Sequence, residues 1–468
     1  MMQKRKYDLG KHLAYGVGSL GDSLSYNIFY SYFIYFITTF AGIRPAAAGV
    51  ISFVAVAWDA VTDPLIGYVS DHSHSKHGRR CPFLLMYSVP MGLTVFALFY
   101  NPTLSESEKV LYYLVANILF WLFFTCVDIP YLAFGAELET GYDERTRLRK
   151  WARLFMSVGD ILVVSGTLPL VDLFSKFTHQ ESSSWALLGA FYGGISAIAF
   201  FLSGFMLRKY DAPVPRGPRS SFKKVLREYF QILKIREGQK IILVTFIANL
   251  IIGIGSSCNM FMWKYTFHFE SAEIAMVGLV GTLCSLFAVF PTEWIASRFG
   301  KKNASSCSFL LILVGFMILY FAPHTLPWAL AAQIIKLCGV SMFWTIVFSL
   351  AYDVAEIDEF KNGQRREGLI TSLNSFFMKI GVSFGMWFSG TALDIFQLDP
   401  TQSVQSEKAV SLLNMTAMIV PAVIAVFGIC VSRRYRVTKV KFTLLKEALA
   451  KRRECRAYST QGFEDILK

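Results

Sequence analysis

Two aspartates four residues apart, Asp59 and Asp63, lie within a long apolar stretch of this sequence. On a helix, side chains four residues apart project from the same face. Two carboxylates held close together in a medium of low dielectric constant repel each other, and a proton or a bound cation relieves that repulsion. Thr62 lies between them, and Thr125 and Asp128 would add oxygen ligands, which hard cations prefer, if their stretch lies beside this one. The five residues therefore predict a cation site.

Other ionisable residues also lie inside apolar stretches, where they are costly and usually face a cavity. Four of them, and two aromatic residues that could stack on a sugar face, are candidates for substrate binding: Asp22, Asp128, Arg153, Lys379, Tyr131 and Trp344. Structural alternatives remain open, namely Asp63-Pro64 as a helix cap, Asp128 as a buried ion pair and Arg153 as a snorkelling side chain. The aromatic residues could equally be packing. The sequence assigns no clear role to Asp160, Lys264 or Lys336.

Apolar stretches long enough to cross a bilayer make up most of the chain. Of its 468 residues, 54% are hydrophobic and only 17% are charged, whereas soluble domains have about a quarter charged residues. A spanning helix needs about 20 mostly apolar residues. We therefore predict an all-α membrane protein with twelve transmembrane helices, at residues 14–42, 45–70, 82–101, 108–137, 151–175, 185–207, 240–267, 273–297, 304–322, 326–354, 369–396 and 409–432.

Basic residues follow the even-numbered spans. The intervening connections hold little more than Arg44, Lys109, Lys176 and Lys408. Basic connections face the cytoplasm, so both termini are predicted to be cytoplasmic. This placement accounts for the net charge of +13 without nucleic-acid binding. We divide the chain into an N-terminal six-helix half (1–207), a cytoplasmic basic linker (208–239), a C-terminal six-helix half (240–432) and a cytoplasmic tail (433–468).

Two basic segments outside the spans have helical patterns. The linker contains SFKKVLREYFQILK and the tail contains VKFTLLKEALAKRR, and both are typical of helices that lie at a membrane interface. The N-terminal MMQKRKYDLGKH leads into a span without a cleavage-type site, so we expect no removable signal peptide. The eight cysteines form no C-x-x-C pair, so we predict neither disulfides nor a zinc site.

A short motif recurs six spans apart. Its first copy follows span 2 and consists of small, acidic and basic residues that suit a tight hairpin: Gly67, Asp71, Gly78, Arg79 and Arg80. The second copy, at 293–302, ends in Gly-Lys-Lys and is degraded. The motif resembles the loop motif of the major facilitator superfamily, whose six-helix halves repeat.

Longer motifs point to one family within that superfamily. They are YGVG at 15–18, WDAVTDPLIG at 58–67, GRRCPF at 78–83, VDIPY at 127–131 and GQRREG at 363–368. In this order, over nearly the whole chain, they resemble the glycoside–pentoside–hexuronide:cation symporter family, to which the melibiose permease belongs. The resemblance implies a sugar symporter driven by Na⁺, Li⁺ or H⁺.

The resemblance also implies roles for individual residues. Asp59 and Asp63 match the cation carboxylates, Thr125 a hydroxyl beside the cation, and Asp128 the acid that joins cation and sugar. Arg153 matches a sugar-site arginine and Lys379 the lysine of span 11. The chain departs from melibiose-type members at three positions, where a sugar-binding aspartate, a tryptophan and an asparagine are replaced by Ser23, Leu132 and Thr62. The nearest acid to Ser23 is Asp22.

We therefore predict cation-coupled symport of a sugar or glycoside by alternating access, in the plasma (inner) membrane. The expected partners are the sugar and membrane lipid, the expected state is a monomer, and no cofactor is expected besides the coupling ion. A carrier of lysolipids or other amphiphiles, a proton-driven exporter and a membrane receptor without transport are the alternatives. We find no nucleophile–base set, phosphate-binding loop or metal cluster, so an enzyme is not predicted.

Overall fold

The computed structural model describes residues 8–71, 73, 75, 78–138, 142–211, 229–363, 366–402, 404–454 and 456–467, and every regular element in these ranges is helical. The first group comprises α1 (Leu9–Thr39), α2 (Pro45–Asp71), α3 (Cys81–Leu98), α4 (Glu106–Leu138), α5 (Tyr142–Thr178), α6 (Glu181–Leu207) and the 3₁₀ turn η1 (Arg208–Tyr210). The second comprises α8 (Arg236–Tyr265), α9 (Ser271–Phe287), α10 (Val289–Phe299), α11 (Lys301–Phe321), α12 (Leu326–Asn362), α13 (Glu367–Ile395), α14 (Glu407–Asn414), the π-helical turn η2 (Met415–Ile419), α15 (Val420–Arg433), α16 (Lys439–Arg453) and α17 (Glu464–Leu467).

The helices have the lengths and surfaces of membrane spans, which confirms the predicted all-helical membrane fold. Within the described ranges, ten helical stretches are long and apolar enough to cross a membrane, and the bent pair α9–α10 would make an eleventh. α1 is not counted among them. It has 31 residues and is long enough, but Ser, Tyr, Asn and Asp residues lower its apolar content. Large apolar side chains point outward from the spans, as Phe205 does with 61% of its surface exposed, which suits contact with lipid.

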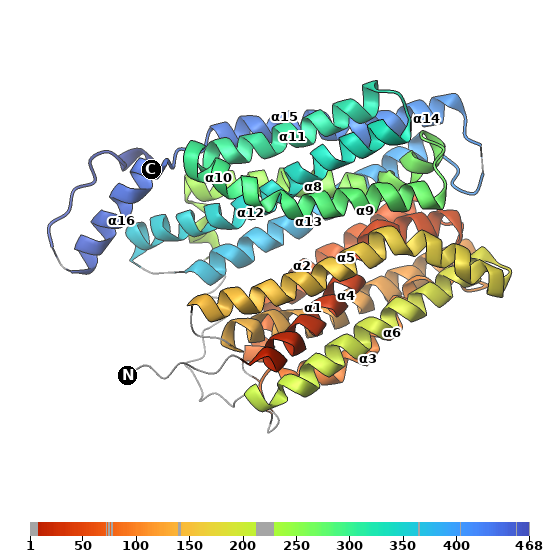
Figure 1. The fold of residues 1–468 in the computed structure, drawn as a ribbon, viewed down its shortest axis with the longest axis horizontal. Coiled ribbons are helices and arrows are strands. Elements are labelled where there is room, and N and C mark those ends of the chain that lie inside the picture. The colour runs from red at the N-terminus through yellow and green to blue at the C-terminus, as the bar shows by residue number, and fades with distance from the viewer. Residues whose placement is uncertain are drawn as a thin grey trace. The chain divides into compact units, whose positions relative to one another are not determined.

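The described residues form two compact units. Unit 1 comprises Met1–Gly217, Trp263–Leu279 and Met386–Ala409, and unit 2 comprises Pro218–Met262, Val280–Gly385 and Val410–Lys468. In unit 1, α1 packs on α5 and α6, α3 packs on α4 and α6, and α2 packs on α4; Figure 1 shows these helices in red to yellow. α3 and α6 approach each other closely at two glycines: a Cβ added to Gly92 would lie only 2.5 Å from the carbonyl oxygen of Gly193.

Unit 2 is organised around α11, which packs on α12 and α15. The degraded second copy of the loop motif still forms an ion pair there, since Lys301 Nζ lies 2.6 Å from Asp353 Oδ1 on α12. The last predicted span is interrupted by η2, which directly precedes α15 and Pro421. Proline cannot donate the hydrogen bond that an α-helix requires, and a wider π turn accommodates that loss.

The tail helix α16 lies against the end of α12 (Figure 1). Arg453 forms an ion pair with Glu359 at 2.6 Å, and the ring of Phe360 on α12 contacts the rings of two tail residues, Tyr458 and Phe463. The helix predicted in the tail is confirmed by α16, and its placement at a membrane interface stays a prediction. Of the predicted linker helix, residues 229–233 are helical, and residues 221–228 lie outside the described ranges, as do residues 1–7 of the N-terminal segment.

Candidate functional site

The two aspartates of the predicted cation site converge on one hydroxyl group. Asp59 and Asp63 lie on α2, and the Thr125 hydroxyl on α4 is 2.5 Å from Asp59 Oδ1 and 3.3 Å from Asp63 Oδ1. Asp59 is fully buried. The expectation that the two spans lie side by side is thus confirmed, and three oxygen-bearing side chains meet at one point of unit 1.

α2 holds both carboxylates on one face because it runs unbroken from Pro45 to Asp71, with Pro64 inside it. The alternative in which Asp63-Pro64 only caps a broken helix is therefore wrong. Pro64 cannot donate a hydrogen bond to the carbonyl of Ala60. The Thr62 hydroxyl donates to the carbonyl of Asp59 at 3.1 Å, within the same turn of α2.

The remaining predicted cation residue, Asp128, follows Thr125 by three residues on α4. Residues three apart share a helix face, so Asp128 lies on the Thr125 side of α4. It is half-buried. Within the described ranges, no group of three or more His, Cys, Asp or Glu residues is arranged to hold a metal ion. The cluster of two carboxylates and a threonine suits a proton or an alkali cation better than a transition metal.

A second polar cluster joins α1 to α5 and includes predicted substrate residues. Ser23 Oγ donates to Asp160 Oδ1 at 2.5 Å, and Asn27 Nδ2 donates to the same oxygen at 2.9 Å. Arg153 lies beside this cluster, with its Nη1 3.9 Å from Asp160 Oδ2. Asp22 is half-buried on α1, within electrostatic reach of Asp160. Sequence reasoning missed Asp160 and Asn27, whose only signal was their polar character inside a span.

Three further predicted substrate residues lie on α4, α12 and α13. Tyr131 is buried between helices: its ring stacks on Tyr15 at 4.5 Å, and its hydroxyl donates to the Tyr15 carbonyl at 2.6 Å and lies 2.5 Å from Ser19 Oγ. In this structure Tyr131 therefore packs α4 against α1. Trp344 and Lys379 lie in unit 2, on α12 and α13, and both are half-buried.

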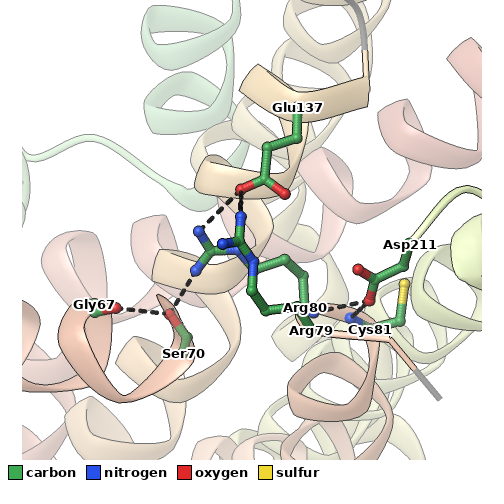
Figure 2. A network of polar contacts seen from close by, with 7 residues as sticks. All are labelled: Gly67, Ser70, Arg79, Arg80, Cys81, Glu137 and Asp211. Atoms are coloured by element: carbon green, nitrogen blue, oxygen red, sulfur yellow. Dashed lines mark hydrogen bonds and ion pairs between the residues drawn. The ribbon is translucent and has the colours of Figure 1, made fainter. Parts of the chain in front are cut away.

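The loop motif forms an ion-pair network at one end of unit 1 (Figure 2). The Arg80 guanidinium lies between Glu137 at the end of α4, with Nη2 3.0 Å from Oε1, and Ser70 of α2, whose Oγ accepts from Nη1 at 2.7 Å. Ser70 in turn donates to the carbonyl of Gly67 at 3.0 Å. Arg79 also pairs with Glu137. The side chain of Asp71 lies outside the described parts of the structure.

Asp211, which sequence reasoning missed, completes this network from the position directly after η1, at the start of the linker. Its Oδ2 accepts hydrogen bonds from the backbone N–H groups of Arg80 at 2.8 Å and Cys81 at 2.7 Å, at the start of α3 (Figure 2). Gly78 has φ +105°, and a Cβ there would collide with the Asp211 carboxylate. The motif glycine is therefore required both by its backbone conformation and by Asp211.

Comparison with known proteins agrees with this architecture. A family model described as "MFS/sugar transport protein" matches residues 14–439. The isoprimeverose transporter of Lactiplantibacillus pentosus is 25% identical over 454 residues, covering 96% of this chain and 92% of the relative. YagG of Escherichia coli (strain K12), a candidate glycoside/cation symporter, is 26% identical over 453 residues, covering 94% of this chain and 95% of the relative.

Two further similarities add a relative named for a different substrate and confirm the fold of this chain. A candidate sulfoquinovose importer of Salmonella typhimurium is 24% identical and covers 96% of this chain and 94% of its own length. The crystal structure of a D-xylose–proton symporter superposes with a TM-score of 0.65 at 14% identity, over 92% of this chain and 99% of that one. The chain therefore belongs to the MFS/sugar transport protein family, a melibiose-permease-like family of membrane symporters within the major facilitator superfamily.

Proposed function

We propose that this chain couples the movement of Na⁺ or H⁺ down its gradient to the uptake of a sugar or glycoside. The observation that carries the proposal is the convergence of Asp59, Asp63 and Thr125 inside unit 1. Two carboxylates held close together repel each other because both are negatively charged, and the shared hydroxyl has only one proton to donate to them. A cation or a proton placed between them removes this repulsion and lowers the energy of the cation-bound state.

Coupling follows from the position of Asp128 on α4. It lies on the Thr125 side of that helix, so the charge of the cation site acts on any substrate group that Asp128 binds. A bound cation therefore raises the affinity for substrate, and by thermodynamic linkage bound substrate raises the affinity for the cation. If both together favour one of two conformations, the pair crosses the membrane together.

The proposal extends to the finer features predicted from the sequence. The proposed substrate residues are Asp22, Ser23, Asp128 and Arg153 on the first half, and Trp344 and Lys379 on the second. Residues 1–207 and 240–432 form the two moving halves, joined by the linker 208–239 and followed by the tail 433–468. Both termini face the cytoplasm, and the protein acts in the plasma (inner) membrane.

Uptake into proteoliposomes tests the proposal. The wild-type chain and the variants Asp59→Asn, Asp63→Asn and Asp172→Asn are reconstituted, and uptake of a panel of radiolabelled neutral glycosides is measured with an inward Na⁺ gradient, an inward H⁺ gradient or K⁺ alone. Asp172 lies on α5 and is exposed, so it is a matched control for removal of one carboxylate.

We expect an ion gradient to stimulate uptake in the wild type and in Asp172→Asn, and stimulation to disappear in Asp59→Asn and Asp63→Asn. Full wild-type stimulation in both α2 variants would reject the cation site. A fluorescent lysophospholipid is tested in the same vesicles. If it is taken up and no glycoside competes, the substrate is a lipid and the sugar part of the proposal is wrong. Ion-driven efflux without uptake would identify an exporter.

A further inference from the structure

Asp160 is held on one of its two oxygens only. Oδ1 accepts hydrogen bonds from Ser23 and Asn27, at 2.5 and 2.9 Å. Asn27 also donates to Ser23 Oγ at 3.0 Å, so the two donors brace each other. Gly159 makes this contact sterically feasible, since a Cβ there would lie 2.8 Å from Ser23 Oγ. The carboxylate is therefore fixed in orientation by α1.

The other oxygen, Oδ2, faces Arg153. No side chain in the described ranges donates a hydrogen bond to Oδ2, and its nearest cationic atom is Arg153 Nη1 at 3.9 Å. That separation exceeds the roughly 2.7–3.2 Å of a hydrogen bond. Arg153 has 55% of its side chain exposed and Asp160 21%, so both groups are accessible. The fixed acceptor Oδ2 and the donor Nη1 are thus close enough for one small polar group to bind to both.

A hydroxyl group fits between them, because it can donate and accept at once. If each hydrogen bond is about 2.8 Å long, an oxygen that bridges atoms 3.9 Å apart subtends an angle of about 90°. It would donate to Asp160 Oδ2 and accept from Arg153. A carboxylate or sulfonate can only accept, so it cannot donate to Oδ2, and its charge is repelled by Asp160.

We propose that Asp160 and Arg153 form a subsite that recognises one hydroxyl group of a neutral sugar and disfavours an anionic group at that position. Ser23 and Asn27 act as positioning residues that fix the acceptor. The inference rests on the proposed function and narrows its substrate class. Among sugars with the same ring, the protein selects those with an uncharged hydroxyl here over their uronate or sulfonate counterparts.

Equilibrium binding to the purified full-length protein in nanodiscs tests this subsite. The probes are isoprimeverose, methyl β-glucoside, glucuronate and sulfoquinovose, followed by the single deoxy analogues of whichever neutral sugar binds best. The variants are Asp160→Asn, Arg153→Gln and the control Asp172→Asn. Asparagine in place of Asp160 keeps an acceptor for Ser23 and Asn27, but presents an N–H group where Oδ2 had been.

We expect Asp160→Asn to weaken binding of the neutral sugar about ten- to a hundredfold, the value of one charge-assisted hydrogen bond. The deoxy analogue that lacks the bridging hydroxyl should bind to Asp160→Asn and to the wild type with affinities that differ by less than about threefold, because it cannot form this hydrogen bond in either protein. A purely structural role would weaken binding of the sugar and all its analogues alike. Asp172→Asn should bind every probe as the wild type does.

Arg153→Gln keeps the inference testable if Asp160→Asn does not fold, because Arg153 is exposed. It should produce the same selective loss for the same hydroxyl. Three results would overturn the subsite. Both variants could bind the neutral sugar as tightly as the wild type does, or they could lose affinity equally for all analogues. The wild-type protein could also bind glucuronate or sulfoquinovose more tightly than the neutral sugar. Ion-driven uptake of a sulfonate would leave the proposed coupling intact and reject only this inference. Hydroxyl-selective binding without any ion dependence would support the subsite and reject the proposed coupling.

Discussion

The Asp211 carboxylate should stabilise the start of α3 through hydrogen-bond geometry more than through charge. Both backbone donors, at Arg80 and Cys81, bond to the same oxygen, Oδ2. An asparagine can place its single carbonyl oxygen at that point and keep both bonds, whereas an alanine removes both. Asp211 is only 8% exposed and the two donors are buried, so water does not readily replace the lost acceptor.

The expected magnitudes follow from this difference. Leaving two buried N–H groups without an acceptor costs about 1–3 kcal/mol each, and we expect about 3 kcal/mol in total for Asp211→Ala. Asp211→Asn loses the interaction of a negative charge with the N-terminus of α3, which is worth about 0.3–1 kcal/mol. At about 2–4 °C per kcal/mol, the apparent Tm falls by about 6–12 °C for alanine and by about 1–4 °C for asparagine.

Thermal unfolding of the purified protein, followed by tryptophan fluorescence at one fixed scan rate, measures these shifts, because irreversible unfolding makes Tm depend on scan rate. Alkylation of Cys81, mapped by mass spectrometry, reports local opening, since this thiol is fully buried at the first residue of α3. Asp172→Ala is the control. Equal losses for alanine and asparagine would show that charge dominates, and no loss for alanine would refute the reasoning altogether.

Two further predictions concern the loop motif and the tail. Gly78→Ala should lower the free energy of unfolding by about 1–3 kcal/mol more than Gly300→Ala does, as measured by thermal unfolding. Both glycines have positive φ, but a Cβ at Gly78 would meet the Asp211 carboxylate, whereas the space around Gly300 is open. Equal losses of stability would mean that Asp211 moves aside freely. Phe360→Ala should destabilise the protein by about 3 kcal/mol and make the tail susceptible to limited proteolysis, whereas Arg453→Ala should change stability by less than about 1 kcal/mol, because its side chain is 52% exposed.

The sequence predicted the helices well because their signal is local. Residues 108–137 were expected as a span and α4 occupies Glu106–Leu138, since an apolar stretch of this length is stable in a bilayer only as a helix. Interruptions were harder to foresee. The span expected at 273–297 is divided between α9 and α10 near Ala288. Pro291 lies just beyond this junction and cannot donate a hydrogen bond to the carbonyl of Phe287. A proline alone does not predict such an interruption, because Pro64 lies inside the unbroken α2.

The candidate site was predictable where its residues are close in sequence. The spacing of Asp59 and Asp63 alone places two carboxylates on one helix face, and their contact with Thr125 required only that α2 and α4 be neighbours. Asp211 binds the start of α3 from 130 residues away, and Asp160 meets Ser23 from another helix. Nothing local to either aspartate indicates these partners, because each contact depends on how two helices pack.

Burial separates the two polar clusters of unit 1 into different chemical tasks. Asp59 is fully buried beside Asp63 and Thr125, and a small cation or a proton is the kind of ligand that such a buried carboxylate favours. Asp160 and Arg153 remain accessible, so they can exchange water for a sugar hydroxyl at little cost. A symporter needs both kinds of site, and the two sites that we propose lie on α1, α2, α4 and α5 within one unit. Under this proposal, the charge on α2 acts on a substrate at α1 and α5 through the low-dielectric interior that the helices share.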